Sequence, residues 1–334
     1  MARLEHQVKF QAHDSGANDL GGSRFRSLAT ELKCSLRRPG FNMQMIYAAV
    51  AILCVSVVGF SLTQVHFQDT GNMVLALLLT IAVMTPLLIY LSETRKKYIF
   101  DLLLVVFWAL FYAYLLNLPV VVATRIGSHI ALKDAYLANF DRAVGLPIPA
   151  IVAWAAQNWL GRFASGSYFW LFPLMRVAIL LPALAGRAGH AQKFLTANLV
   201  SFFVGLPLFA LFPAVGPWYG YPIPARPDQL GSQATLLLFR QAGPCQYHVP
   251  AGIVCFPSFH VVWAILCARA LWSFRLLRVP VVSLAALIIL STLTTGEHYI
   301  VDLIAGAIIA VIAIYAAEWL SKIRLSPHAE FASE

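Results

Sequence analysis

The sequence predicts an all-α membrane protein, a transmembrane bundle of about eight helices with its chemically active residues at the extracytoplasmic ends of the last helices. Of the 334 residues, 60% are hydrophobic and only 12% are charged, whereas about a quarter of the residues of a soluble domain are charged. The hydrophobic residues gather in runs long enough to cross a hydrocarbon core, which takes roughly 17–25 helical residues. These observations exclude an ordinary soluble domain.

Eight apolar runs are expected to cross the membrane. They cover residues 43–63, 72–92, 99–122, 167–185, 194–213, 257–273, 279–295 and 299–320. The chain is therefore expected to divide into four parts: a disordered cytoplasmic tail (1–41), two N-terminal helices (42–98), a larger membrane domain (99–325) and a short cytoplasmic tail (326–334). A cleaved secretory signal is not expected, because the sequence near Met1 lacks the short apolar run that such a signal contains.

The basic residues indicate the orientation of these helices. The net charge is +9, but Lys and Arg concentrate in the tails and in short loops, which is a topology signal and not a nucleic-acid footprint. The residues concerned are Arg37, Arg38, Arg95, Lys96, Lys97, Arg187, Lys193, Arg275, Arg278, Lys322 and Arg324. All of them lie on one side if both termini are cytoplasmic, and the third, fifth and seventh runs then end facing the periplasm or a lumen.

Two outer segments separate the runs on that side. Residues Ile148 to Leu160 form an amphipathic stretch with Trp154 and Trp159, which favours a helix at the membrane interface over a short additional span. The second segment, 214–255, is long and rich in Gly, Pro and aromatic residues. Long loops of this kind are often lids or binding elements, so we expect this segment to cover the chemically active residues at the helix ends.

This second segment also holds candidate phosphate ligands and two cysteines. Arg226 or Arg240 would contribute the positive charge that holds a phosphate. Cys245 and Cys255 lie on the side where disulfides persist, and both a bridge and two free thiols remain open.

Polar residues cluster at the start of the sixth and eighth runs. Ser258 and His260 open the sixth, and His298 precedes the eighth, with one apolar hairpin between them. An out-and-back pair returns the chain to its starting side, so these residues should lie at the same depth. His298 and Asp302 are four positions apart, which makes them neighbours on one helix face. The carboxylate could then orient one imidazole and leave its other nitrogen free to attack, with His260 as the acid.

The same positions are helix N-termini, where free N–H groups and the positive end of the dipole favour an anion. Pro257 suits the first turn of a helix, and Ser258 suits either a capping or a phosphate-binding role. The sequence thus outlines a phosphate site.

These residues resemble a known family. Pro257-Ser258-x-His260 and His298-x-x-x-Asp302 are similar to the second and third motifs of the type-2 phosphatidic acid phosphatase superfamily, membrane enzymes that cleave or transfer phosphate groups on lipids. The resemblance implies that His298 is a nucleophile that forms a phosphohistidine, Asp302 its orienting partner, His260 the acid for the leaving group and Ser258 a phosphate ligand. It implies no metal or other cofactor, and its partners are the membrane and a lipid phosphate or phospholipid.

Further matches are similar to the inositol phosphorylceramide synthase-like branch, whose members transfer a phospho-head-group. They are the segment from Phe212 to Trp218, Thr294-Thr295, and the acidic residues Asp134 and Asp141, and the whole resemblance covers about residues 100–320. Two motifs depart from the family pattern: no Lys-x6-Arg-Pro is present, and Ser291-Thr292 replaces Ser-Arg. The basic phosphate ligands are therefore unassigned by the resemblance.

Several residues have a second interpretation. Asp134 and Asp141 would bind an acceptor's hydroxyls or be solvated surface charge, and Glu297 would hold an acceptor or remain structural. Arg176 lies within a span, where a charge is costly, so it should face the bundle interior. The alternative is a non-catalytic lipid-binding protein or a lipid transporter. Transporters are often built from internal repeats, and no repeat is evident in the sequence.

Overall fold

The computed structural model describes residues 40–63, 66–67, 78–79, 81–83, 97–241, 246–247 and 252–322. The chain divides into two units, Met1–Gln44 and Met45–Glu334. The described part of the first unit contains only the beginning of helix α2. All the other elements belong to the second unit.

The described chain is helical apart from one pair of two-residue strands, as the sequence predicts. The helices are α2 (Phe41–Thr63), α4 (Lys97–Leu115), α5 (Asn117–Ile126), η1 (Gly127–His129), α6 (Asp134–Ala143), α7 (Ile148–Gln157), α8 (Trp159–Gly166), η2 (Ser167–Trp170), α9 (Leu171–Leu184), α10 (Ala188–Leu211), α11 (Pro217–Gly220), α12 (Pro227–Arg240), α13 (Phe259–Leu271), η3 (Arg275–Leu277), α14 (Arg278–Thr294) and α15 (Ile300–Lys322). Strands β1 (His66–Phe67) and β2 (Gln246–Tyr247) pair in parallel.

Six helical runs in the described residues are long and apolar enough to cross a membrane. They are Gln44–Thr63, Ile99–His129, Trp159–Leu184, Ala188–Leu211, Arg275–Thr294 and Ile300–Lys322. The predicted span at 72–92 lies largely outside the described residues. The predicted span at 257–273 forms the shorter helix α13, of 13 residues, because Pro257 and Ser258 precede the helix. The count of eight is therefore not confirmed.

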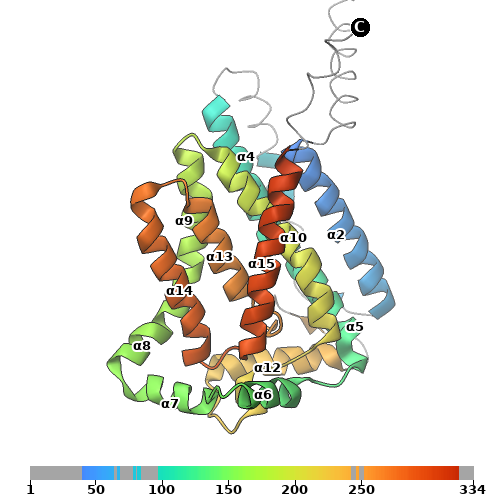
Figure 1. Ribbon diagram of the computed structural model, residues 1–334. Helices are drawn as coiled ribbons and strands as arrows, with labels where there is room; N and C mark the ends of the chain where they lie inside the picture. The colour runs from blue at the N-terminus through green and yellow to red at the C-terminus, as the bar shows by residue number, and fades with distance from the viewer. Residues whose placement is uncertain are drawn as a thin grey trace, which may run out of the picture. The chain divides into compact units, whose positions relative to one another are not determined.

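Helices α9, α10, α13, α14 and α15 pack side by side, and α6, α7 and α12 run across the ends of this group (Figure 1). The predicted amphipathic helix is broken at Asn158, whose backbone is extended, into α7 and α8. Helix α7 has 10 residues and is about 15 Å long. It is too short for an additional span, which favours the interface prediction.

A core of buried residues lies under the beginning of α15. Its members come from α6, α7, α13, α14, α15, the segments on either side of α11 and the segments before α13 and α15: Leu137, Ala138, Ile148, Ala214, Tyr221, Cys255, Val261, Leu293, Tyr299 and Leu303. The residues of the site therefore rest on elements that are packed against one another.

The outer segment predicted as a cover contains helices α11 and α12. Helix α12 packs against α5 and η1, and Arg240 at its end donates to the backbone carbonyls of Gly127 (2.9 Å), Ser128 (3.3 Å) and Ile130 (2.5 Å). These contacts anchor the C-terminal end of α12.

Candidate functional site

The turn between α14 and α15 positions His298. Gly296 adopts a φ of +70°, its N–H donates to Leu293 O (3.1 Å), and Glu297 N–H donates to Thr292 O (3.0 Å). This pair of hydrogen bonds is a Schellman motif, whose left-handed residue favours glycine. Gly296 is therefore the turn residue at which the chain leaves α14, and His298 lies two residues before α15.

Asp302 contacts His298 at the start of α15. His298 Nδ1 lies 3.3 Å from Asp302 Oδ2, and Tyr299 N–H donates to the same oxygen (2.8 Å). Asp302 is the third residue of the helix, the position from which an acidic side chain caps the preceding backbone N–H. The predicted contact is present, although His298 precedes the helix and does not share a helix face with Asp302.

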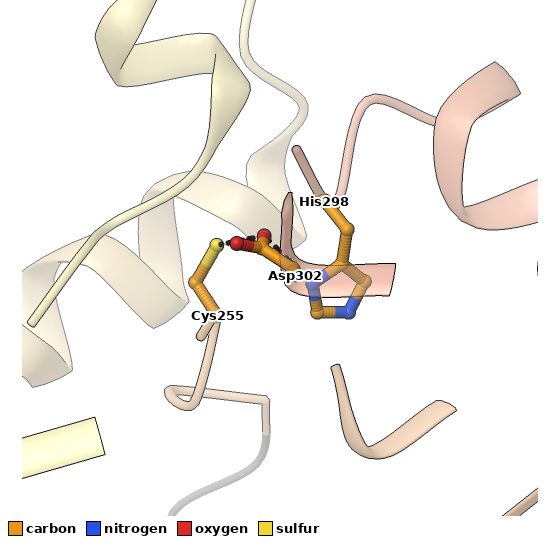
Figure 2. Close-up of side chains that lie close together, drawn as sticks. All are labelled: Cys255, His298 and Asp302. Carbon is orange, nitrogen blue, oxygen red and sulfur yellow. Dashed lines mark hydrogen bonds and ion pairs between the residues drawn. The ribbon is translucent and has the colours of Figure 1, made fainter. Parts of the chain in front are cut away.

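Cys255 is the third side chain at this point (Figure 2). Its Sγ lies 3.2 Å from Asp302 Oδ2, while the second ring nitrogen of His298 points away from the carboxylate. Cys255 is a free thiol, so of the two alternatives left open for it the bridge is excluded; Cys245 lies outside the described residues. Burial, and then the charge of Asp302, raise the pKa of the Cys255 thiol, which therefore stays protonated.

The three side chains also form the kind of donor set that a metal ion could use. One nitrogen, one sulfur and one oxygen from His298, Cys255 and Asp302 all lie within 4.8 Å of one another. Such ligands suit Zn²⁺.

Ser258 joins α13 to α15. Its Oγ accepts the N–H of Val261 (3.4 Å), so the capping role predicted for Ser258 is confirmed, and its own N–H donates to Asp302 O (3.1 Å). A Cβ on Gly306 would lie 2.5 Å from Ser258 O, so only glycine permits this approach of the two helices. The Ser258 side chain is fully buried.

His260 is held by an aromatic ring. It stacks on Tyr168, with ring centroids 4.0 Å apart and an angle of 23° between the planes, and the Tyr168 hydroxyl lies 3.4 Å from His260 Nδ1. Among the described residues, the buried Nε2 has no hydrogen-bond partner. The centroids of His260 and His298 are 5.9 Å apart, so the structure brings the two histidines together.

Arg226 lies beside the His298 turn. Its guanidinium donates to Glu297, to Asp228 Oδ2 (3.1 Å) and to Thr295 O (2.8 Å), and its hydrogen bonds to Asp228 lower the pKa of that carboxyl. Gln229 also donates to Glu297 (3.0 Å). Glu297 is therefore paired, and Arg226 reaches the turn that carries His298.

Arg240 does not join this group. The 14 residues of α12 separate it from Arg226, a distance of about 20 Å along the helix, and its guanidinium is engaged with the carbonyls at η1. Of the two predicted phosphate ligands, only Arg226 lies near the histidines.

A cavity of about 660 Å³ lies between α7, α8, the α11–α12 region and the end of α14. Its walls are mainly apolar, with polar groups from Arg162, Ser165, Arg226, Gln229, Thr294 and Thr295. Tyr168, which stacks on His260, forms part of the wall. The cavity therefore connects the Arg226 cluster with the residue that supports His260.

Asp134 is a buried structural acid, which corrects both predictions made for it. Its carboxylate accepts the N–H groups of Val215 (3.0 Å) and Gly216 (2.9 Å) and lies 3.0 Å from the Tyr299 hydroxyl. Burial raises its pKa. The Phe212–Trp218 segment is thus held by Asp134 through backbone contacts, which a loop position in the sequence did not suggest.

Asp141 and Arg176 also differ from their predictions. Asp141 is fully buried and accepts the N–H of Ile300 (3.1 Å) at the start of α15, so it is neither solvated nor open to an acceptor. Arg176, expected to face the bundle interior, is exposed on α9. Cys255 and Tyr168 are the site residues that the sequence did not identify; their only signals were positions close to the Pro257–His260 motif and to the start of a span.

Comparison with known proteins gives one result. A family model described as the PAP2 superfamily matches residues 135–316, more than half of the chain, and this range includes both histidines and Asp302. No curated protein and no solved structure matches the chain.

Proposed function

The chain belongs to the PAP2 superfamily, and from this premise we propose that it is an integral membrane phosphoesterase that forms a phosphohistidine on His298. Its substrate is a lipid phosphate or a phospholipid head group. The observation that carries the proposal is the pairing of two histidines 5.9 Å apart, of which one is oriented by a buried carboxylate and the other keeps an unpartnered nitrogen within the described residues.

The first step transfers the phosphoryl group to the protein. Nε2 of His298 attacks phosphorus, so that an N–P bond forms while the P–O bond to the lipid breaks. His260 gives its proton to the departing oxygen. Asp302 accepts the Nδ1–H of His298 throughout, which keeps the ring in the tautomer that attacks.

The second step regenerates the histidine. His260, now neutral, takes a proton from water or from an alcohol, the resulting oxygen attacks phosphorus, and the N–P bond breaks. When the substrate is a lipid phosphate, water gives inorganic phosphate and an alcohol gives a phosphate monoester. When it is a phospholipid, phosphorus carries the head group onto His298, so an alcohol gives a new phosphodiester, as in inositol phosphorylceramide synthesis, and every acceptor uses the same residues.

Arg226 supplies the charge for the phosphoryl oxygens. It lies beside the turn that carries His298 and is paired there with Glu297, so an arriving phosphate would replace the Glu297 carboxylate as its partner. Ser258 and backbone N–H groups in the first turn of α13 are the neutral ligands in this proposal. Arg240 is left out because its donors hold η1.

The cavity beside Arg226 supports an amphiphilic substrate. Its walls are mostly apolar, while Arg162 and Arg226 provide positive charge. A lipid phosphate has both an apolar chain and a negative charge, which match these walls and arginines.

The basic residues Arg275 and Lys322 lie at the opposite ends of α13 and α15 from the histidines, which supports a site facing the periplasm or a lumen, with cytoplasmic termini.

The test uses the full-length protein in detergent with a lipid phosphate that carries labelled phosphate. We expect release of inorganic phosphate and an acid-labile label on the protein. In His298→Ala both should fall by about 10³-fold or more, because the nucleophile is lost. His129→Ala is the matched control, since His129 is exposed in η1 and should retain both.

The same assay with inositol and ceramide, added as possible acceptors, separates transfer from hydrolysis, because transfer gives a labelled, acceptor-dependent product, an inositol phosphate or a ceramide phosphate, in place of inorganic phosphate. A folded His298→Ala protein with the activity of the parent would contradict the phosphohistidine mechanism. If neither protein had activity but both bound the lipid, a lipid-binding or transport function would be favoured instead.

A further inference from the structure

We propose that Cys255 is a positioning residue for this reaction: its thiol hydrogen holds the Asp302 carboxylate in the orientation from which that carboxylate directs His298. The inference rests on the proposed function, because it assigns a role within the same site. It concerns a residue that lies outside the two sequence motifs.

The geometry places three donors on one oxygen. Asp302 Oδ2 lies 2.8 Å from Tyr299 N, 3.2 Å from Cys255 Sγ and 3.3 Å from His298 Nδ1, as Figure 2 shows for the two side chains. The other oxygen, Oδ1, is buried without a hydrogen-bond partner in the described part of the chain. Rotation of a carboxylate about its last torsion has no strong intrinsic preference, so the hydrogen bonds decide which oxygen faces the imidazole.

The thiol has the properties that a donor needs. Cys255 is 4% exposed, and its burial together with the nearby carboxylate raises its pKa. The hydrogen therefore remains on sulfur and is available to Oδ2. The nearest other acceptor is Glu297 O, at a longer distance of 3.7 Å.

The position of Cys255 in the chain gives this contact a second consequence. Cys255 lies in the segment that leads into α13, and Asp302 lies in the first turn of α15. Together with the hydrogen bond from Ser258 N–H to Asp302 O (3.1 Å), the thiol ties the beginning of the His260 helix to the carboxylate that orients His298.

A zinc site is the competing explanation for the same three side chains, since Cys, His and Asp are all ligands of that ion. The hydrogen-bond explanation accounts for a further fact: both Sγ and Nδ1 lie at hydrogen-bonding distance from a single oxygen. We therefore favour the positioning role and include zinc in the test.

The experiment compares Cys255→Ala and Cys255→Ser with a matched control, Cys267→Ala. Cys267 is also fully buried and lies within α13, so its replacement removes a similar volume without touching Asp302. We expect Cys255→Ala to lower kcat by roughly 10- to 100-fold, the effect of losing a hydrogen bond to a charged group, with little change in KM. Serine, which keeps a donor, should restore a large part of kcat.

Three results would overturn the proposal. They are a Cys255→Ala protein with the kcat of the parent, an equal loss in Cys267→Ala, and a serine variant no better than the alanine variant. Binding of one Zn²⁺ per chain in equilibrium dialysis, abolished in Cys255→Ala, would also replace the positioning role by a metal site. The His298→Ala assay separates this failure from failure of the proposed function, because it tests the nucleophile with Cys255 intact.

Discussion

The two histidines of the site are held in opposite ways. His298 is 3% exposed and faces a buried carboxylate through Nδ1, so hydrogen bonds fix its direction. His260 stacks on Tyr168 at 4.0 Å, so an aromatic face supports it while Nε2 has no partner among the described residues. The contrast matches the two roles in the proposed mechanism, because a nucleophile must point in one direction and an acid must exchange its proton.

The two environments also differ in their cost. The His298 side requires a carboxylate inside the protein, which is expensive unless it is hydrogen-bonded, and Asp302 meets this requirement with three donors on Oδ2. The His260 side has a stacked aromatic ring and one long contact, between the Tyr168 hydroxyl and His260 Nδ1 (3.4 Å). A charged residue is therefore placed where direction matters, and an aromatic residue where mobility of a proton matters.

The largest effect expected from this contrast is on the leaving group. His260→Ala should lower the rate of phosphohistidine formation from a lipid phosphate by about 10²–10⁴-fold, because the departing alkoxide receives no proton. With an aryl phosphate whose phenolate departs unprotonated, the same variant should lose much less. Rapid-quench measurement of the labelled protein compares the two substrates directly.

His298→Ala serves as the control, since it should fail to form the intermediate with either substrate. An equal loss of intermediate formation with both substrates in His260→Ala would show that the two histidines do not divide the work as proposed.

An effect of intermediate size is expected on the free energy of unfolding, through Asp141, which accepts the N–H of Ile300 close to His298. Burial, and then the charge of Asp302, raise the pKa of Asp141 to about 6. Because the folded pKa exceeds the unfolded one, the stability that Asp141 contributes is full below about pH 4 and is lost as the pH rises through 6. Relative to Asp141→Asn, the parent should lose at most about 3 kcal/mol of unfolding free energy between pH 4 and pH 7.

Asparagine keeps an acceptor for Ile300 N–H, so the cap of α15 remains in the variant. Denaturant unfolding of both proteins in detergent at a series of pH values measures the difference. Parallel pH dependence of the parent and the variant would show that Asp141 does not titrate in this range.

The smallest effect is expected at the His260 side. Tyr168→Phe keeps the stacked ring and removes only the hydroxyl, which lies at the long distance of 3.4 Å from Nδ1. We expect a change in kcat of no more than a few-fold, in keeping with a weak hydrogen bond. Tyr168→Leu should cost more than Tyr168→Phe, and steady-state kinetics of the two variants decides whether the ring or the hydroxyl supports His260.

The sequence predicted the helical class and the meeting of the histidines, because span length and a two-run hairpin fix which helix ends share a face. It did not predict the surroundings of these residues. Nothing in an outer loop's composition shows that Asp134 and Asp141 turn inward to accept backbone N–H groups. Such contacts depend on which backbone donors the tertiary fold leaves free.

The same reasoning explains the errors on the basic residues. Arg226 and Arg240 were equivalent in sequence, but they lie at the two ends of α12, and the packing of that helix selects Arg226 for the site. Arg176 was expected inside because charge is costly in a span, yet it is exposed on α9. Hydrophobicity predicts that a helix crosses the membrane, and it does not predict which of its faces meets other helices.

Because hydrogen bonds fix the end of α14, the position of His298 depends on the number of residues between α14 and α15. Five residues, 295–299, connect α14 to α15, and Gly296 and Glu297 are committed to closing the first helix while Tyr299 is committed to opening the second. A single inserted or deleted residue here would break one of these terminations or rotate the imidazole away from Asp302. Residues elsewhere on α14 and α15 can be substituted, but the number of residues between the two helices cannot change.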